Sequence, residues 1–246
     1  MTECGVINMK NLSAFTLAEV LITLGIIGVV AALTLPSLVG NYKRKVTANK
    51  VKKFYSVMSQ ATGRAIAENG SMEYWDGFSS HHNGKEMQQW FNKYLNPYLN
   101  ITDEWIGKDE ESGNESLFIV MSDGGIVLFT NWAGSSPDID DETGEDQNNS
   151  KDYYNGLIHV AYLTNAKAIK KEDRKSCVNA FSFLFYSPLK KQYYFQPYAY
   201  QADTPEKYKR DFFLKQIKSG NTQYCTALMM MDGWEIKDDY PFGYKY

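Results

Sequence analysis

The chain has 246 residues, with 26 Lys and Arg against 29 Asp and Glu and a net charge of −3, so its charge gives no reason to expect a nucleic-acid partner. Aromatic residues make up 15% of the chain and include 18 tyrosines. This content argues against disorder and favours a folded, strand-containing domain.

Residues 15–35 form an apolar run that contains one charged residue, Glu19. At about 1.5 Å per residue, a helix of this length can cross the roughly 30 Å hydrocarbon core of a bilayer. Helix is expected because a lone span must satisfy its backbone hydrogen bonds internally. A carboxylate inside such a span is costly, so Glu19 is a candidate functional residue.

The segment from Ser13 to Glu19, followed by the apolar run and Pro36, resembles the N-terminal segment of type IV pilins and type II secretion pseudopilins. In that family a short leader is removed on the cytoplasmic side just before a Phe, and the new amino terminus is usually methylated. The resemblance implies cleavage between Ala14 and Phe15, with Ala14 where the family usually has Gly. Glu19 then lies at the family's fifth mature position.

The physical chemistry of the segment agrees with this resemblance. Cleavage would leave an ammonium on Phe15, one helical turn from Glu19, in the same chain or a neighbouring copy. Gly25 and Gly28 would let such helices approach closely. Pro36 lacks a backbone donor and should kink the helix or open it locally.

The domain organisation expected from the resemblance to pilins has four parts. They are a leader (1–14), a transmembrane and filament-core helix (15–36), an amphipathic continuation (37–68) and a globular α+β head (69–246) with an antiparallel sheet. The resemblance implies a single-pass protein of the bacterial inner membrane with an extracytoplasmic head. The implied partners are prepilin peptidase, copies of itself or other pseudopilins, the inner-membrane assembly platform and the lipid bilayer.

Other interpretations of the apolar run stay open. It could be a plain anchor for an extracytoplasmic binding domain that does not polymerise, a secretory signal peptide cut after Ala32, or a buried core helix. Met9 is an alternative start, which would remove Cys4. An enzyme is not expected, because the chain has no nucleophile elbow, phosphate loop or metal motif.

A basic stretch after the apolar run conflicts with the extracytoplasmic head. Residues 21–67 contain no acidic residue, and the stretch holds Lys43, Arg44, Lys45, Lys50, Lys52 and Lys53. The positive-inside rule would place this side in the cytoplasm. We expect the stretch to contact anionic lipid headgroups or acidic faces of neighbouring subunits instead.

The helical pattern continues to about Glu68 and ends at Asn69-Gly70. Its apolar positions recur mostly every three or four residues: Leu38, Tyr42, Val46, Val51, Phe54, Tyr55, Met58, Ala61, Ala65 and Ile66. A loop with the exposed pair His81-His82 is expected over residues 70–84, then a short helix over 85–95. A charged connection is expected over 104–115.

The strongest hairpin signal is Asp123-Gly124 between the β-prone runs 117–121 and 126–129. Further strands are expected over 153–163, with His159 as a packed residue, and over 179–186, paired with 192–200. Residues 167–175 are expected to be helix or turn. A helix should open at Thr204-Pro205 and another should cover 224–231. The aromatic tail 240–244 should pack on the head or on other subunits.

Residues 138–146 carry six carboxylates. Asp138, Asp140 and Glu142 alternate and could supply oxygen ligands to Ca²⁺, although the spacing is not that of an EF-hand. Because some pseudopilins bind calcium in a head loop, the resemblance favours this cofactor modestly. A solvated acidic loop is the default.

Cys177 and Cys225 are the two cysteines of the head. In an extracytoplasmic head they could form a disulfide, and pilin heads often carry such a bridge near the C-terminus. Two free buried thiols are the alternative, and no motif supports a Cys–His nucleophile.

Overall fold

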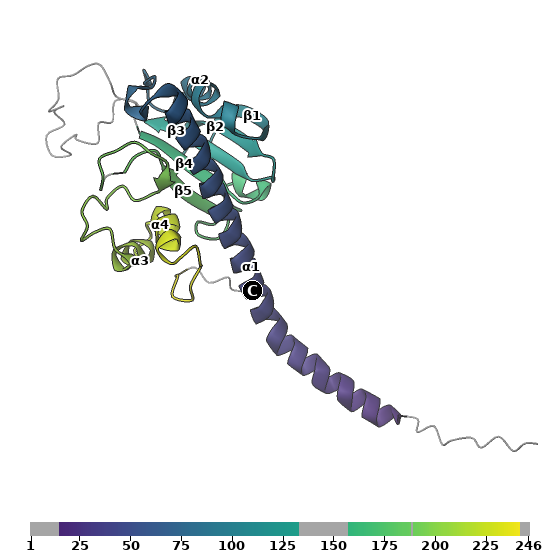
Figure 1. Ribbon diagram of the computed structural model, residues 1–246. Helices are drawn as coiled ribbons and strands as arrows, with labels where there is room; N and C mark the ends of the chain where they lie inside the picture. Colours follow the sequence, from purple (N-terminus) through teal and green to yellow (C-terminus); the bar gives the residue numbers. More distant parts are fainter. Residues whose placement is uncertain (1–14, 133–156, 188, 242–246) are drawn as a thin grey trace, which may run out of the picture. The chain divides into compact units, whose positions relative to one another are not determined.

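A computed structural model describes residues 15–132, 157–187 and 189–241 (Figure 1). The chain divides into two units, Met1–Tyr42 and a folded domain that begins at Lys43. Each unit is described by itself below. One helix, α1 (Leu17–Asn69), contributes residues to both units.

The helix α1 is continuous through Pro36, so this proline does not divide it into two separate helices. It ends at the predicted position, where Gly70 takes a left-handed φ of +80° that a glycine tolerates easily. By length and composition, α1 is the one helix in the described parts of the chain that could cross a membrane.

The folded domain contains a six-stranded antiparallel sheet in the order β1-β2-β3-β4-β5-β6. The predicted α+β class, with a long N-terminal helix, is therefore confirmed. The strands are β1 (Ile101–Lys108), β2 (Glu115–Met121), β3 (Ile126–Trp132), β4 (Leu157–Leu163), β5 (Ala180–Leu184) and β6 (Gln196–Pro197).

The predicted hairpin is the β2–β3 pair, in which Val120 lies opposite Ile126. Gly124 in its turn has a φ of +80°. Asp123 accepts a hydrogen bond from the Gly125 amide at 3.2 Å, as turn aspartates commonly do. The predicted pairing between residues 179–186 and 192–200 is also present, as a short contact of β5 with β6.

Two sequence predictions are wrong in their boundaries. The segment predicted as a charged connection begins inside the edge strand β1, which ends at Lys108, and the actual connection to β2 covers residues 109–114. Its charges are compatible with a strand because an edge strand keeps one side in solvent. The helix predicted to open at Thr204 begins only at Arg210, after turns over 204–209.

The remaining helices are α2 (Gly84–Tyr94), α3 (Arg210–Lys218) and α4 (Cys225–Met231). Short 3₁₀ turns lie at Met72–Tyr74, Asn96–Tyr98, Ala166–Ile169 and Thr222–Tyr224. The Asn83 side chain caps α2 by accepting the Glu86 amide at 3.1 Å. Figure 1 shows α3 and α4 side by side near β5.

The main core lies between the second half of α1 (residues 43–69) and one face of the sheet. Phe54 stacks on Tyr162 of β4 with ring centroids 4.2 Å apart, and Val51 and Met58 are fully buried. Leu38, Tyr42 and Val46 are exposed, so the predicted apolar face of residues 37–68 packs only from Ala48 onward.

The opposite face of the sheet carries a smaller apolar cluster around Phe118, Ile126 and Leu128. Trp105 of β1 stacks on Phe118 at 5.0 Å. Because strand side chains alternate between faces, the next positions on this face are Thr130 and Trp132 of β3 and His159 of β4. These residues begin a polar region that this apolar cluster does not cover.

Candidate functional site

The apolar segment is exposed along its length within the described part of the chain. Phe15 exposes 87% of its surface and Leu33 76%. A soluble domain rarely leaves so large a continuous apolar surface uncovered. By its length and composition, the segment could cross a membrane.

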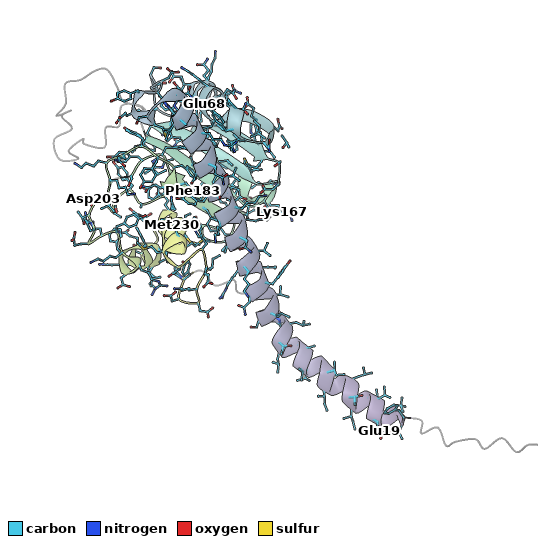
Figure 2. The ribbon with its side chains drawn as sticks, in the orientation of Figure 1. Glu19, Glu68, Lys167, Phe183, Asp203 and Met230 are labelled. Carbon is cyan, nitrogen blue, oxygen red and sulfur yellow. A yellow bond between two sulfur atoms is a disulfide. The ribbon has the colours of Figure 1, made fainter. Side chains whose placement is uncertain are left out.

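Glu19 lies in the first turn of α1 (Figure 2) and forms a reciprocal capping box with Thr16. Its carboxylate accepts the Thr16 amide at 2.9 Å and the Thr16 hydroxyl at 2.8 Å, while the Glu19 amide donates to the hydroxyl at 3.3 Å. The pattern Thr-x-x-Glu in the sequence indicates this arrangement, which was not among the predictions above. The capping box gives Glu19 hydrogen bonds within its own chain.

Gly25 and Gly28 have open space where a side chain would begin, with no atom within 4 Å. Within the described residues, neither glycine is required by packing inside the chain. The surface beside them is free to approach another helix or lipid.

The basic stretch, in contrast, is engaged within the folded domain. Arg44 forms an ion pair with Asp238, Lys53 pairs with Asp123 at 3.0 Å, and Lys50 donates to the Thr164 carbonyl at 3.2 Å. Burial disfavours the Asp123 carboxylate, but the Lys53 ammonium and the Gly125 amide hold its pKa below the usual range. Part of the positive charge of the basic stretch is thus already balanced by carboxylates of the folded domain.

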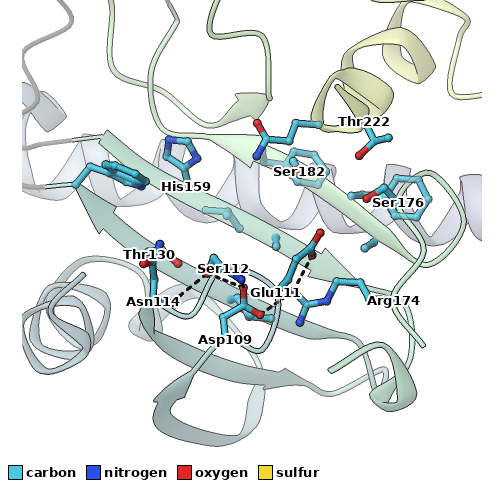
Figure 3. Close-up of a pocket in the computed structure, with 18 residues that line it drawn as sticks. Asp109, Glu111, Ser112, Asn114, Thr130, His159, Arg174, Ser176, Ser182 and Thr222 are labelled. Carbon is cyan, nitrogen blue, oxygen red and sulfur yellow. Dashed lines mark hydrogen bonds and ion pairs between the residues drawn. The ribbon is translucent and has the colours of Figure 1, made fainter. Parts of the chain in front are cut away.

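A cleft of about 270 Å³ lies on the face of the sheet opposite α1 (Figure 3). One wall is the β1–β2 connection, with Asp109, Glu111, Ser112 and Asn114. The floor comes from β3, β4 and β5, and Thr222 and Gln223 close another side. The lining combines aromatic rings with hydroxyl, amide and carboxylate groups.

Arg174 fixes one wall of this cleft and is almost completely buried, with 4% of its side chain exposed. Its Nη1 donates to Asp109 at 2.7 Å and to Glu111 at 3.0 Å. Its Nε and Nη2 donate to the carbonyls of Ala168 and Ile169 at 2.8 and 3.0 Å. Each guanidinium nitrogen therefore has a partner within the domain.

Burial disfavours the Asp109 carboxylate, but hydrogen bonds from Ser112 and Arg174 hold its pKa below the usual range. Asp109 is consequently ionised near neutral pH and serves as the buried counter-ion of Arg174. This pair holds the β1–β2 connection against the loop that contains Arg174.

All three histidines of the chain lie around Trp132. The His82 ring is nearly perpendicular to the indole at 4.5 Å, and the rings of His159 and His81 lie at 5.7 and 6.1 Å. The buried side chain of Asn131 holds the turn that contains His81 and His82. Its Oδ1 accepts a hydrogen bond from the Asn83 backbone amide at 2.9 Å, and its Nδ2 donates to the Ser80 carbonyl at 2.9 Å.

Burial, followed by the nearby His82, lowers the pKa of His159 from 6.5 to about 4. Burial, followed by the nearby His81, also lowers the pKa of His82. His159 is therefore neutral at pH 7. It was predicted as a packed strand residue and does pack in β4, but it also lines the cleft.

The calcium candidates Asp138, Asp140 and Glu142 lie outside the described residues. Among residues 15–132, 157–187 and 189–241, no group of three His, Cys, Asp or Glu side chains could hold a metal ion.

Cys177 and Cys225 form a disulfide in the structure, with Cα atoms 5.6 Å apart. It ties the segment before β5 to the first residue of α4. Closing a loop with a sequence separation of 48 residues corresponds to about 4 kcal/mol of stabilisation in the chain-entropy model.

The cleft was not predicted from the sequence. Its lining comes from separate segments, 109–114, 128–132, 159–161, 174–183 and 222–223, that only the strand order brings together. No pattern of residues within a single segment predicts the cleft.

The fold and these sites define an α+β domain carried on a long N-terminal helix that is apolar enough to span a membrane. Residues 37–244 match the family described as "Family of unknown function (DUF6613)", and the chain belongs to this family. The match begins after the apolar run, so residues 15–36 lie outside it. No curated protein and no solved structure matched the chain.

Proposed function

We propose that this chain is a structural subunit of a pilus-like or pseudopilus filament of a type II secretion or type IV pilus system. The observation that carries this proposal is Glu19, the one charge of an apolar helical segment whose large apolar side chains are exposed. A plain anchor has no need of a carboxylate at this depth. The amine of a processed Phe15 would neutralise this carboxylate by forming an ion pair with it.

In this proposal, prepilin peptidase removes residues 1–14 and Phe15 becomes the methylated terminus. The helix is stored in the inner membrane and then packs with copies of itself or other pseudopilins. The folded domain lies on the extracytoplasmic side. The Cys177–Cys225 disulfide supports this side, because such bridges persist mainly in oxidising compartments.

The capping box offers a competing role for Glu19, because a capping carboxylate could serve only to begin the helix. Two substitutions separate the roles. Glu19→Gln removes the charge but keeps an oxygen that can accept the Thr16 amide. Thr16→Val removes the hydroxyl but keeps the charge.

The test is the yield of sedimentable polymer from cells that express each variant in place of the wild-type chain. We expect Glu19→Gln to abolish most of the polymer and Thr16→Val to retain it, with equal amounts of monomer in the membrane. Wild-type polymer yield from Glu19→Gln would refute the assembly role. Polymer retained by Glu19→Gln but lost in Thr16→Val would assign Glu19 to helix capping alone.

The second candidate is a membrane-anchored extracytoplasmic binding domain that does not polymerise. The cleft on the sheet supports it, because a concave site with convergent polar groups suits ligand binding. Absence of polymer from the wild-type chain, together with an intact leader, would favour this candidate. Neither candidate is an enzyme.

A further inference from the structure

The cleft on the face of the sheet opposite α1 has polar groups that are not engaged elsewhere (Figure 3). Within the described residues, the side chains of Asn114, Ser176, Ser182 and Gln223 make no hydrogen bond, and Asn114 donates only through its main-chain amide, to Ser112. Together they offer two hydroxyl groups and two carboxamides, each able to donate and to accept. A ligand with several hydroxyl groups could satisfy them.

One end of the cleft has an aromatic surface. Trp132 exposes 37% of its surface, although most of the large aromatic residues of the domain are buried. The rings of His82 and His159 pack against it, with ring centroids 4.5 and 5.7 Å away. A tryptophan that is fixed and yet partly exposed provides a flat apolar surface for a ligand that has an apolar face of its own.

The charges of the cleft disfavour an anionic ligand. Among the described residues of the lining, Arg174 is the one Lys or Arg, and its guanidinium is already bonded to Asp109, Glu111 and two carbonyls. A phosphate or carboxylate ligand would be repelled by the carboxylates of Asp109 and Glu111, and the guanidinium nitrogens of Arg174 already have acceptors. The side chain of Glu111 is 52% exposed and can accept hydrogen bonds from hydroxyl groups.

We propose that this cleft binds the end of a neutral saccharide chain. A pyranose ring has an apolar face of C–H groups, which would lie on Trp132, and a rim of hydroxyl groups. Asn114, Ser182, Gln223 and Glu111 would bond that rim. The volume of about 270 Å³ is just below the roughly 300 Å³ at which typical ligand pockets begin, which suits the end of a chain and not a larger ligand. The proposal does not depend on filament assembly.

The test uses the full chain in a polyoxyethylene detergent, because sugar-based detergents would compete. Maltotriose, cellotriose and triacetylchitotriose are titrated up to about 10 mM, a range suited to millimolar dissociation constants, with binding followed by ligand-observed NMR. Inorganic phosphate and triglycine are titrated separately. We expect at least one saccharide to bind and neither of the other two probes.

Trp132→Leu should weaken saccharide binding about tenfold, since a lost aromatic contact is worth up to roughly 1.5 kcal/mol. The matched control is Trp105→Leu, which removes a tryptophan on the same sheet face outside the cleft and should leave binding unchanged. Gln223→Ala, at an exposed position, should weaken binding several-fold and serves if Trp132→Leu does not fold.

Three results would overturn the proposal. They are no saccharide binding in the tested range, equal binding by wild type and the Trp132→Leu and Gln223→Ala variants, or binding of phosphate or triglycine in place of the saccharides.

Discussion

The two halves of α1 belong to one helix but meet different surroundings. In the first half, residues 17–42, large apolar side chains are exposed around the helix, as Leu24 and Ile27 illustrate at 60% and 62%. In the second half, Phe54 and Met58 are buried against the sheet, while Lys52 and Gln60 face solvent. The second half is stabilised by its own domain, whereas the first half has the length and composition of a membrane span.

The largest expected effect comes from a substitution in the packed second half of α1. Phe54→Ala removes a ring that stacks on Tyr162 and should lower the free energy of unfolding of the domain by about 3–5 kcal/mol. Leu24→Ala, the matched control in the first half, should leave it unchanged. Chemical denaturation of both variants in the same detergent measures this, and equal losses would contradict the comparison.

The next effect concerns the first half alone. Ile27→Arg places a charge in the middle of the apolar segment and should cost about 2.5–3.5 kcal/mol of membrane insertion. Gln60→Arg adds the same charge on the exposed side of the second half and should cost nothing. Membrane fractionation of both variants gives the result. If Ile27→Arg remained fully inserted, a membrane role for the first half would be untenable.

Acid should destabilise the folded domain through His159. Its pKa is about 4 in the folded state against 6.5 ordinarily, so the unfolded state binds more protons between these values. Stability is therefore complete above about pH 6.5 and falls by up to about 3 kcal/mol as the pH drops to 4.

The measurement is the free energy of unfolding between pH 7.5 and pH 4. His159→Gln should flatten this dependence, whereas His81→Gln, which removes an exposed ring of the same cluster, should flatten it much less. Asp109 and Asp123 have lowered pKa values, so the stability that their ionised carboxylates contribute is lost only under more acidic conditions. An unchanged slope in His159→Gln would assign the acid sensitivity to other groups.

The smallest effect concerns the basic stretch. Lys53→Met removes the exposed ion pair with Asp123 and should cost about 0.2–1 kcal/mol of domain stability. Lys52→Met is the control, because Lys52 makes no ion pair with a described residue. Thermal unfolding of the two variants compares them. An equal effect would mean that the pair contributes nothing.

Local signals account for what the sequence predicted well. Asn69-Gly70 ends α1 and Asp123-Gly124 turns the β2–β3 hairpin, because both depend on backbone conformations that a few residues determine. The strand β1 was missed because its charges belong to the solvent side of an edge strand, and nothing in a single segment identifies an edge.

The sites were predictable to different degrees for the same reason. Phe15, Glu19 and Pro36 lie in one segment, and their spacing carries the resemblance to pilins. The cleft requires Asn114, Trp132 and Gln223 to meet across the sheet. Which strand pairs with which depends on the whole domain, so no sequence pattern placed these side chains together.

The proposed filament function requires the first half of α1 to become the amino terminus of a mature, assembling subunit. Mass spectrometry of the chain extracted from bacterial membranes tests this most directly. We expect a protein that begins at Phe15 and carries one added methyl group on its terminal amine. A chain that retains Ala14 and the residues before it, with an unmodified terminus, would contradict the account.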